Sequence, residues 1–322
     1  MDASLVPVVR GQGAGPSADW ASSKDRQRRT RAAGAGLAPR IRTGRHALAV
    51  LGRPRLEIKT PEQLLLMRRA GLVVGRTLEV LRATVRPGIS TAELDAVAED
   101  SIRGAGAVPS FQGYQGFPAS ICASVNDEVV HGIPGSRVLA EGDLVSIDCG
   151  AIVEGWHGDA AITLAVGAGT TPEAAQLDRV TERAMWDGIA AARTGGRVGD
   201  ISRAVEGSVQ GAGHYGIVED YTGHGIGTAM HLAPDVPNYS GPRGPRLVPG
   251  LALAVEPMVT LGTHRTRVLD DDWTVVTQDG AWAAHHEHTF VLTEHGAWVL
   301  TALDGGEAQL TARGAPFGPL AD

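Results

Sequence analysis

The hydrophobic positions of the chain first follow the spacing of α-helices. Apolar residues recur at helical spacing after Thr60-Pro61-Glu62-Gln63, which offers an N-cap, a proline at the first helical position and a glutamine that completes a capping box. Pro87-Gly88 ends this helix, and Ser90-Thr-Ala-Glu93 is a second capping box, which starts a shorter helix ending near Gly104. The pattern therefore predicts two consecutive helices.

The same order of signals returns later in the chain, which indicates an internal repeat. Thr171-Pro172-Glu173 starts a helix, Gly195-Gly196 interrupts it, and residues 201–209 repeat the short helix. The ending of the first short helix, residues 101–106, aligns with residues 208–213. We therefore expect two related halves.

Between these helices, residues 146–163 (SIDCGAIVEGWHGDAAIT) form two short apolar runs joined at Glu154-Gly155, which predicts a β-hairpin. A two-residue loop sets Asp148 opposite Ala161 with Asp159 as its diagonal neighbour, whereas a loop one residue earlier sets the two aspartates directly opposite. In either register the carboxylates share one face, where their repulsion must be offset by a cation or a shared proton. The alternative is two solvated aspartates.

The repeat supplies two further acids. Residues 141–148 align with residues 249–256, which places Glu256 at the position of Asp148, and the run 283–292 offers Glu287 as the counterpart of Asp159. If the halves close about a pseudo-two-fold axis, four carboxylates meet in a central antiparallel sheet of an α+β fold. Because four such groups would destabilise a protein without a cation, the pattern favours a metal site.

The histidines add nitrogen ligands to this prediction. Ten of the eleven lie between residues 131 and 295, in the same region as the acids. His224, in YTGHGIGTAMH (221–231), has glycines on both sides that allow close backbone approach, and His231 follows in the same segment. One imidazole with four carboxylates is a ligand set suited to divalent first-row metals.

These residues resemble the type I methionine aminopeptidases, metallo-aminopeptidases of the pita-bread fold and peptidase family M24, over about residues 56–300. The resemblance rests on the two motifs quoted above and on NDEVVHGIPG (126–135), AVEPMV (254–259) and HHEHTFVLT (285–293). It implies removal of an N-terminal methionine that precedes a small residue. It also implies two divalent ions (Fe, Mn, Co or Zn) held by Asp148, Asp159, His224, Glu256 and Glu287, with Asp159 and Glu287 bridging.

The resemblance also implies roles around the metals. Glu256 would handle the proton of the attacking water, His231 would donate a hydrogen bond to the oxyanion, and His131 would position the scissile amide. The residues implied to line a methionine pocket are Phe111, Tyr114, Phe117, Cys122 and Trp273, with Met230 nearby. Phe111 and Phe117 stand where many relatives carry Cys and Tyr. His285-His286 replaces a common Gln-Tyr, which leaves the surroundings of the ligands and the metal preference open.

Composition divides the chain into a catalytic domain over residues 56–303 and two tails. Residues 1–55 are predicted as a disordered tail, since residues 1–54 hold ten Lys/Arg against three Asp/Glu and lack apolar periodicity. This tail is expected either to bind ribosomal RNA or to be passive. Residues 304–322 are expected as a second tail. The two cysteines, Cys122 and Cys149, favour a reducing compartment, the cytoplasm, and no apolar run is long enough to span a membrane.

The expected partners are nascent polypeptide N-termini, and nothing in the sequence demands more than a monomer. A proline-directed aminopeptidase of the same fold is one alternative, although such relatives usually bring a folded N-terminal domain. The other is a non-catalytic pita-bread protein that binds the ribosome or nucleic acid. Such a protein should have lost ligands, and all five are present.

Overall fold

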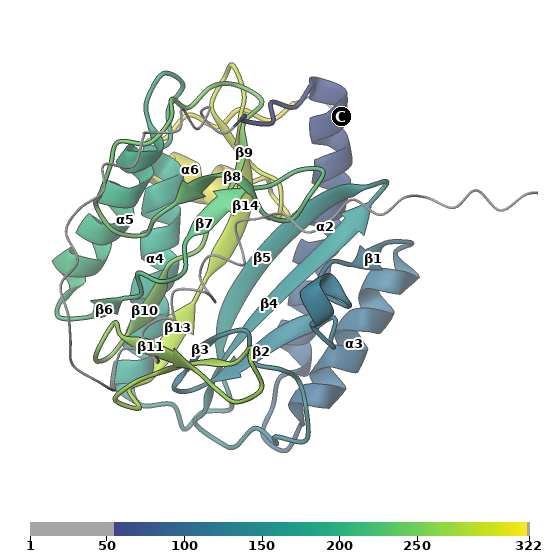
Figure 1. The fold of residues 1–322 in the computed structure, drawn as a ribbon, viewed down its shortest axis with the longest axis vertical. Coiled ribbons are helices and arrows are strands. Elements are labelled where there is room, and N and C mark those ends of the chain that lie inside the picture. The colour runs from purple at the N-terminus through teal and green to yellow at the C-terminus, as the bar shows by residue number, and fades with distance from the viewer. Residues whose placement is uncertain (1–54, 321–322) are drawn as a thin grey trace, which may run out of the picture. The chain divides into compact units, whose positions relative to one another are not determined.

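The computed structural model describes residues 55–320, and a nine-stranded antiparallel sheet lies at their centre (Figure 1). The prediction of a tail over residues 1–55 falls almost wholly outside the described residues. The main path of the sheet runs β1-β4-β5-β14-β9-β7-β8, with β2 paired to β4 and β15 to β14. The strands of this sheet are β1 (Val108–Pro109), β2 (Ile121–Val125), β4 (Leu144–Val153), β5 (Trp156–Ala165), β7 (Gly223–Gly225), β8 (Leu232–Val236), β9 (Ala252–Val255), β14 (Glu287–Leu292) and β15 (Ala297–Val299).

The first helix pair begins where the capping signals predict. Helix α2 (Pro61–Thr84) starts after Thr60, whose backbone N–H donates to Gln63 Oε1 over 2.9 Å, and α3 (Thr91–Gly104) starts after the Ser90 capping box. Close packing of α2 on β5 depends on Gly158, where a Cβ atom would lie 2.7 Å from the Gly71 nitrogen. Both capping boxes and both helices are confirmed.

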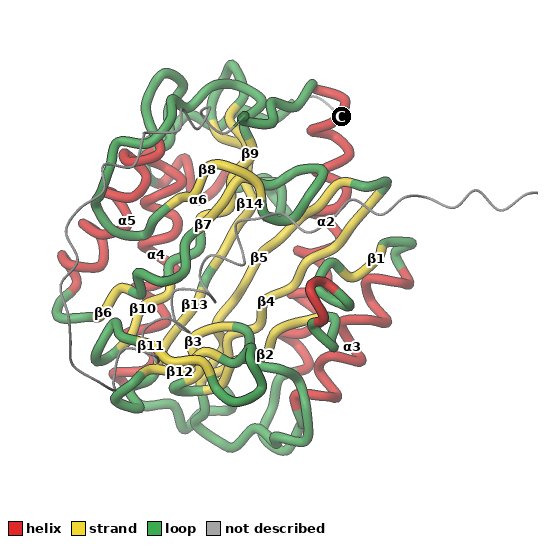
Figure 2. The backbone as a smooth tube through the Cα atoms, viewed as in Figure 1, coloured by secondary structure: helices red, strands yellow, loops and turns green. Residues whose placement is uncertain are grey.

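The second pair repeats this arrangement on the other half of the sheet. Helix α4 (Pro172–Ala191) starts at the N-cap Thr171, and α5 (Val198–Ala212) follows it. One buried cluster joins α2 and α3 to β4 and β5, and another joins α4 and α5 to β9 and β14. Figure 2 shows one helix pair beside each half of the sheet. Each pair thus shields its own half from water.

The two halves meet at the pairing of β5 with β14, where Glu287 lies opposite Ala161. Strands β4 and β9 flank this central pair, so the order β4-β5-β14-β9 has the pseudo-two-fold arrangement expected from the repeat. The second half has no tight hairpin, because shorter strands lie between β9 and β14 along the chain. These strands belong to two small sheets formed by β3 (Glu128–Val130), β6 (Gly216–Ile217), β10 (Met258–Thr260), β11 (Thr266–Val268), β12 (Val275–Thr277) and β13 (Ala283–His285).

The hairpin of β4 and β5 adopts the first of the two expected registers. Val153 pairs with Trp156 across a two-residue turn, in which Glu154 and Gly155 have φ values of 50° and 83°. Positive φ at both central positions is the requirement of a type I′ turn. Asp148 therefore lies opposite Ala161, and Asp159 lies opposite Gly150.

The C-terminal segment differs from the tail that composition predicts over residues 304–322. Helix α6 (Glu307–Ala312) buries Leu310 completely, and the backbone N–H of Gly318 donates to Ala297 O in β15 over 3.0 Å. The Arg313 guanidinium also donates to Asp187 of α4 over 2.8 Å. A few apolar residues among glycine, proline and alanine suffice for this packing, so the described part of the segment belongs to the folded body. No described helix has the length and apolar character needed to cross a membrane.

Candidate metal centre and adjoining pocket

Two strand pairings and the alternation along β5 place three of the candidate ligands on one face of the sheet. Asp148 lies opposite Ala161 of β5, and Ala161 lies opposite Glu287 of β14, so these three share a face. Asp159, two residues before Ala161, lies on the same face. The hairpin prediction of a shared face for Asp148 and Asp159 is confirmed, and Glu287 joins them from the other half.

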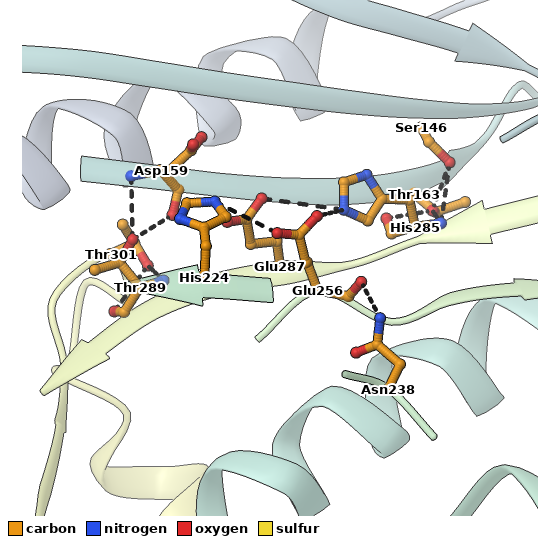
Figure 3. Close-up of polar contacts among 10 residues, drawn as sticks. All are labelled: Ser146, Asp159, Thr163, His224, Asn238, Glu256, His285, Glu287, Thr289 and Thr301. Carbon is orange, nitrogen blue, oxygen red and sulfur yellow. Dashed lines mark hydrogen bonds and ion pairs between the residues drawn. The ribbon is translucent and has the colours of Figure 1, made fainter. Parts of the chain in front are cut away.

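The side chains converge in two overlapping groups (Figure 3). Asp159, His224 and Glu287 form one group, and Glu256, His285 and Glu287 form the other. Within each group the atoms that could bind a metal all lie within 4.8 Å of one another. Four of the five sequence-derived ligands are thus brought together in these groups. The fifth, Asp148, lies on the same face of the sheet, and its carboxyl is close enough to that of Asp159 for the two to affect each other's pKa.

Neighbouring polar side chains hold the backbone that carries the acids. Thr289, next to Asp159 across the β5–β14 pair, donates through its hydroxyl to Asp159 O over 2.8 Å and accepts from Asp159 N over 3.2 Å. Glu256 directly follows β9, and its carbonyl accepts a 3.0 Å hydrogen bond from the side-chain amide of the fully buried Asn238. Both acids are therefore attached to fixed points of the backbone.

His224 reaches the acids because its neighbours have no side chains. A Cβ atom at Gly223 would lie 2.3 Å from Ala254 O, and one at Gly225 would lie 2.3 Å from Ala233 O. The close backbone approach expected from the flanking glycines is confirmed. When Nδ1–H donates to Gly225 O over 3.0 Å, the lone pair is on Nε2, which lies 3.4 Å from Glu256 Oε1. This tautomer suits a metal ligand.

Burial disfavours charge throughout the group. Without a cation, burial raises the pKa of Asp148 to about 7, and it raises the pKa values of Asp159, Glu256 and Glu287 well above their usual range, assisted by the neighbouring carboxylates. Burial lowers the pKa of His224 to about 4, so its imidazole is neutral at neutral pH. A divalent cation binds neutral imidazoles and ionised carboxylates, and it would offset the repulsion between these carboxylates.

Unpartnered buried atoms provide the test of whether a cation fits. Asp148 Oδ1, Asp159 Oδ1, Glu287 Oε1 and His285 Nε2 are buried and have no hydrogen-bond partner among residues 55–320. A buried polar atom without a partner is costly, and here four potential ligand atoms share that condition within one site. The donor set of carboxylate oxygens and imidazole nitrogens fits a divalent first-row metal.

An apolar cluster adjoins the acids. It contains the residues that the sequence suggests for a methionine pocket: Phe111, Tyr114, Phe117, Cys122, Met230 and Trp273. Cys122 of β2 lies opposite Asp148 in the sheet, so the cluster begins beside the first ligand. Gly150, opposite Asp159, makes room for the aromatic wall, because a Cβ atom there would lie 2.9 Å from the Phe111 ring.

Two histidines adjoin this apolar cluster. The ring centroid of His231 is 4.4 Å from that of His224, and its Nδ1 is 2.9 Å from the Tyr114 hydroxyl. The ring centroid of His131 lies 6.2 Å from that of Trp273. His131 also has φ of 60°, an unusual conformation for a residue other than glycine and one that concentrates at functional sites.

Sequence reasoning did not assign roles to several residues of the site. Asn238 and Thr289 act through backbone contacts between distant segments, which leave no motif in the sequence. His157 lies in the quoted hairpin motif, where its backbone N–H donates to Gly227 O over 3.0 Å and joins β5 to the His224 segment. The histidine at position 285 is visible in the sequence, but the inward direction of its side chain is not.

Comparisons with known proteins agree with this geometry. The model of metallopeptidase family M24 matches residues 65–294. A methionine aminopeptidase of Clostridium acetobutylicum is 51% identical over 246 residues, which cover 76% of this chain and 98% of that protein. Methionine aminopeptidase 1 of Mycobacterium tuberculosis is 53% identical over 242 residues, which cover 73% of this chain and 91% of that protein.

Solved structures show the same relationship at the level of the fold. The crystal structure of a methionine aminopeptidase from Thermotoga maritima superposes with a TM-score of 0.75 and 40% identity, covering 77% of this chain and all of that one. A prolidase from Pyrococcus furiosus superposes with a TM-score of 0.61 and 20% identity, and the match covers 76% of this chain and 65% of the prolidase chain. At this identity the comparison shows a common fold alone. The chain therefore belongs to metallopeptidase family M24, as a relative of the methionine aminopeptidases.

Proposed function

We propose that this protein is a metallo-aminopeptidase that removes the N-terminal methionine of nascent polypeptides when the second residue is small. The observation that carries the proposal is a group of carboxylates and imidazoles directly beside an apolar cluster of aromatic and sulfur-containing side chains. The similarity to the methionine aminopeptidases of Clostridium acetobutylicum and Mycobacterium tuberculosis supports it.

In this proposal Asp148, Asp159, His224, Glu256 and Glu287 hold two divalent ions, with Asp159 and Glu287 shared between them. Two bound ions would acidify a water molecule and polarise the scissile carbonyl. Their identity, Fe, Mn, Co or Zn, is left open by the donor types, which several first-row metals accept. The central position of the β5–β14 pair, from which Asp159 and Glu287 both project, supports the assignment of these two as the shared ligands.

The remaining steps belong to side chains. Glu256, which lies between the imidazoles of His224 and His285, accepts the proton of the attacking water. Burial lowers the pKa of His231 well below its usual value, so this ring acts as a neutral hydrogen-bond donor. When the Tyr114 hydroxyl donates to Nδ1, the ring proton of His231 is on Nε2, which donates to the developing oxyanion. His131 positions the scissile amide.

In this proposal the apolar cluster receives the methionine side chain. Phe111, Phe117, Cys122 and Met230 are all at least 94% buried, and Trp273 packs edge-on against Phe117 with ring centroids 5.0 Å apart. Such walls favour an unbranched thioether over charged side chains. A substrate with leucine in first place should be rejected less sharply than one with a charged residue there, because differences in apolar shape contribute only about 1 to 3 kcal/mol.

A peptide panel that varies the first and second residues, read by mass spectrometry, tests the function. We expect release of methionine ahead of Gly, Ala, Ser, Thr, Cys, Pro or Val, and little release ahead of bulky residues. Efficient release of another residue ahead of proline, with Met-Ala peptides intact, would instead support a proline-directed aminopeptidase. We further propose that the basic N-terminal segment binds ribosomes, which sedimentation with ribosomes would test. We also propose a monomeric state, to be tested by light scattering, and a cytoplasmic location, to be tested by cell fractionation.

A further inference from the structure

The two overlapping groups of Asp159, His224, Glu256, His285 and Glu287 are called the acid group below. Of its two imidazoles, His285 is the one that the resemblance does not assign as a ligand. It ends β13, one residue before His286 and two before Glu287. Its side chain is 2% exposed, and its Nε2 has no hydrogen-bond partner in the described structure. An unpartnered buried nitrogen of this kind calls for a ligand or a proton donor.

The backbone of His285 is fixed over the face that carries the acids. Its N–H donates to the hydroxyls of Thr163 over 2.9 Å and Ser146 over 3.2 Å, and its carbonyl accepts from Thr163 over 2.8 Å. Ser146 and Thr163 pair across the hairpin two residues from Asp148 and Ala161, on the same face. Figure 3 shows the imidazole of His285 extending from this attachment toward Glu256 and Glu287.

The distances allow a shared cation. His285 Nε2 lies 3.9 Å from Glu256 Oε2 and 4.0 Å from Glu287 Oε2. Two ligand atoms that are each about 2.1 Å from one ion can be at most about 4.2 Å apart, so both separations lie just within this limit and a common metal would draw the side chains slightly closer together. Glu256 presents its other oxygen, Oε1, to His224 over 3.4 Å. The two imidazoles thus approach opposite oxygens of one carboxylate.

We infer that His285 is an additional metal ligand, which binds a divalent cation through Nε2 together with Glu256 and Glu287. The inference rests on the proposed metal-assisted function of the same site. It gives the centre a second imidazole beside that of His224. Because imidazole favours Co(II) and Zn(II) over Mn(II) more than an amide does, the histidine should also shift the metal preference.

The opposite direction of the neighbouring histidines provides a matched control. His286 Nε2 lies 2.7 Å from Asp178 of α4, and His288 Nδ1 lies 2.8 Å from the Thr301 hydroxyl, so neither ring takes part in the acid group. His286→Gln therefore removes an imidazole from the same segment. It leaves the ligand atoms in place.

The test is paramagnetic NMR of protein labelled with ¹⁵N-histidine, freed of metal and reconstituted with Co(II). We expect two directly coordinated histidine rings in the unaltered protein and in His286→Gln, and one in His285→Gln. His285→Gln should also weaken Co(II) binding in calorimetry by about tenfold or more and bind Mn(II) relatively better. Loss of a hydrogen bond to a ligand can itself cost about 10- to 100-fold in affinity, so the ring count decides.

A single coordinated ring in the unaltered protein would overturn the inference, and this measurement does not require the variant to fold. Hydrolysis of a Met-Ala-Ser peptide is measured on the same Co(II) protein. Hydrolysis with one coordinated ring would refute the role of His285 and leave the proposed function standing. Two coordinated rings without hydrolysis would support the role of His285 and refute the proposed function.

Discussion

His288 should make the folded protein less stable as the pH falls below neutral. Its ring is half-buried beside Trp186, with ring centroids 4.9 Å apart, and its Nδ1 lies 2.8 Å from the Thr301 hydroxyl. Burial lowers the pKa of His288 from 6.5 to about 3, with His286 adding to the shift. Between these two values the unfolded chain binds a proton that the folded protein does not bind. Folding is therefore favoured above the higher pKa and is progressively weakened below it.

The magnitude follows from the pKa difference. At about pH 7.5 the ring is neutral in both states and its contribution to the pH dependence is close to zero. A pH of about 5 is roughly 1.5 units below the pKa of the unfolded state. At about 1.4 kcal/mol per unit, the free energy of unfolding is therefore lower by about 2 kcal/mol than at neutral pH. The loss continues until the pH approaches 3.

Urea unfolding of the metal-free protein at both pH values measures this effect. His288→Asn retains an amide N–H near the position of Nδ1 and cannot take up the proton, so its stability should fall by about 2 kcal/mol less between the two pH values. His214→Asn, at an exposed position, serves as the control for the removal of a histidine as such. Equal pH dependence in His288→Asn and the unaltered protein would refute the reasoning.

Three further predictions concern the site and the N-terminal segment. Asp159→Asn should abolish metal binding in calorimetry as well as peptide hydrolysis, because a neutral amide replaces the proposed shared carboxylate; near-normal turnover with metal bound would contradict this. His231→Ala should lower kcat by about a hundredfold or more at unchanged metal content, as the loss of an oxyanion donor does; loss of a metal ion in elemental analysis would show that His231 is a ligand instead. Deletion of residues 1–54, which precede every motif, should leave kcat/KM for a Met-Ala-Ser peptide within about tenfold, equivalent to 1.4 kcal/mol, and a larger fall would mean that this segment contributes to the site.

Local signals in the sequence determined the helices, the repeat and most of the candidate ligands. Capping boxes place the starts of α2 and α3 because an N-cap and its partner lie within one turn of the chain. The strict alternation of a strand likewise places Asp148 and Asp159 on one face in either hairpin register. The glycines around His224 predict close backbone approach because no other residue leaves that space.

Tertiary structure decided what depends on pairing between distant segments. Alternation indicates that His285 and Glu287 share a face, but the contacts of His285 N with Thr163, 122 residues away in the chain, set which face it is. Long-range packing also brings Leu310 into the core from a segment whose composition resembles a tail. Such contacts depend on which surfaces pack together after the chain has folded. The spacing of residues along the sequence does not determine which distant segments come into contact.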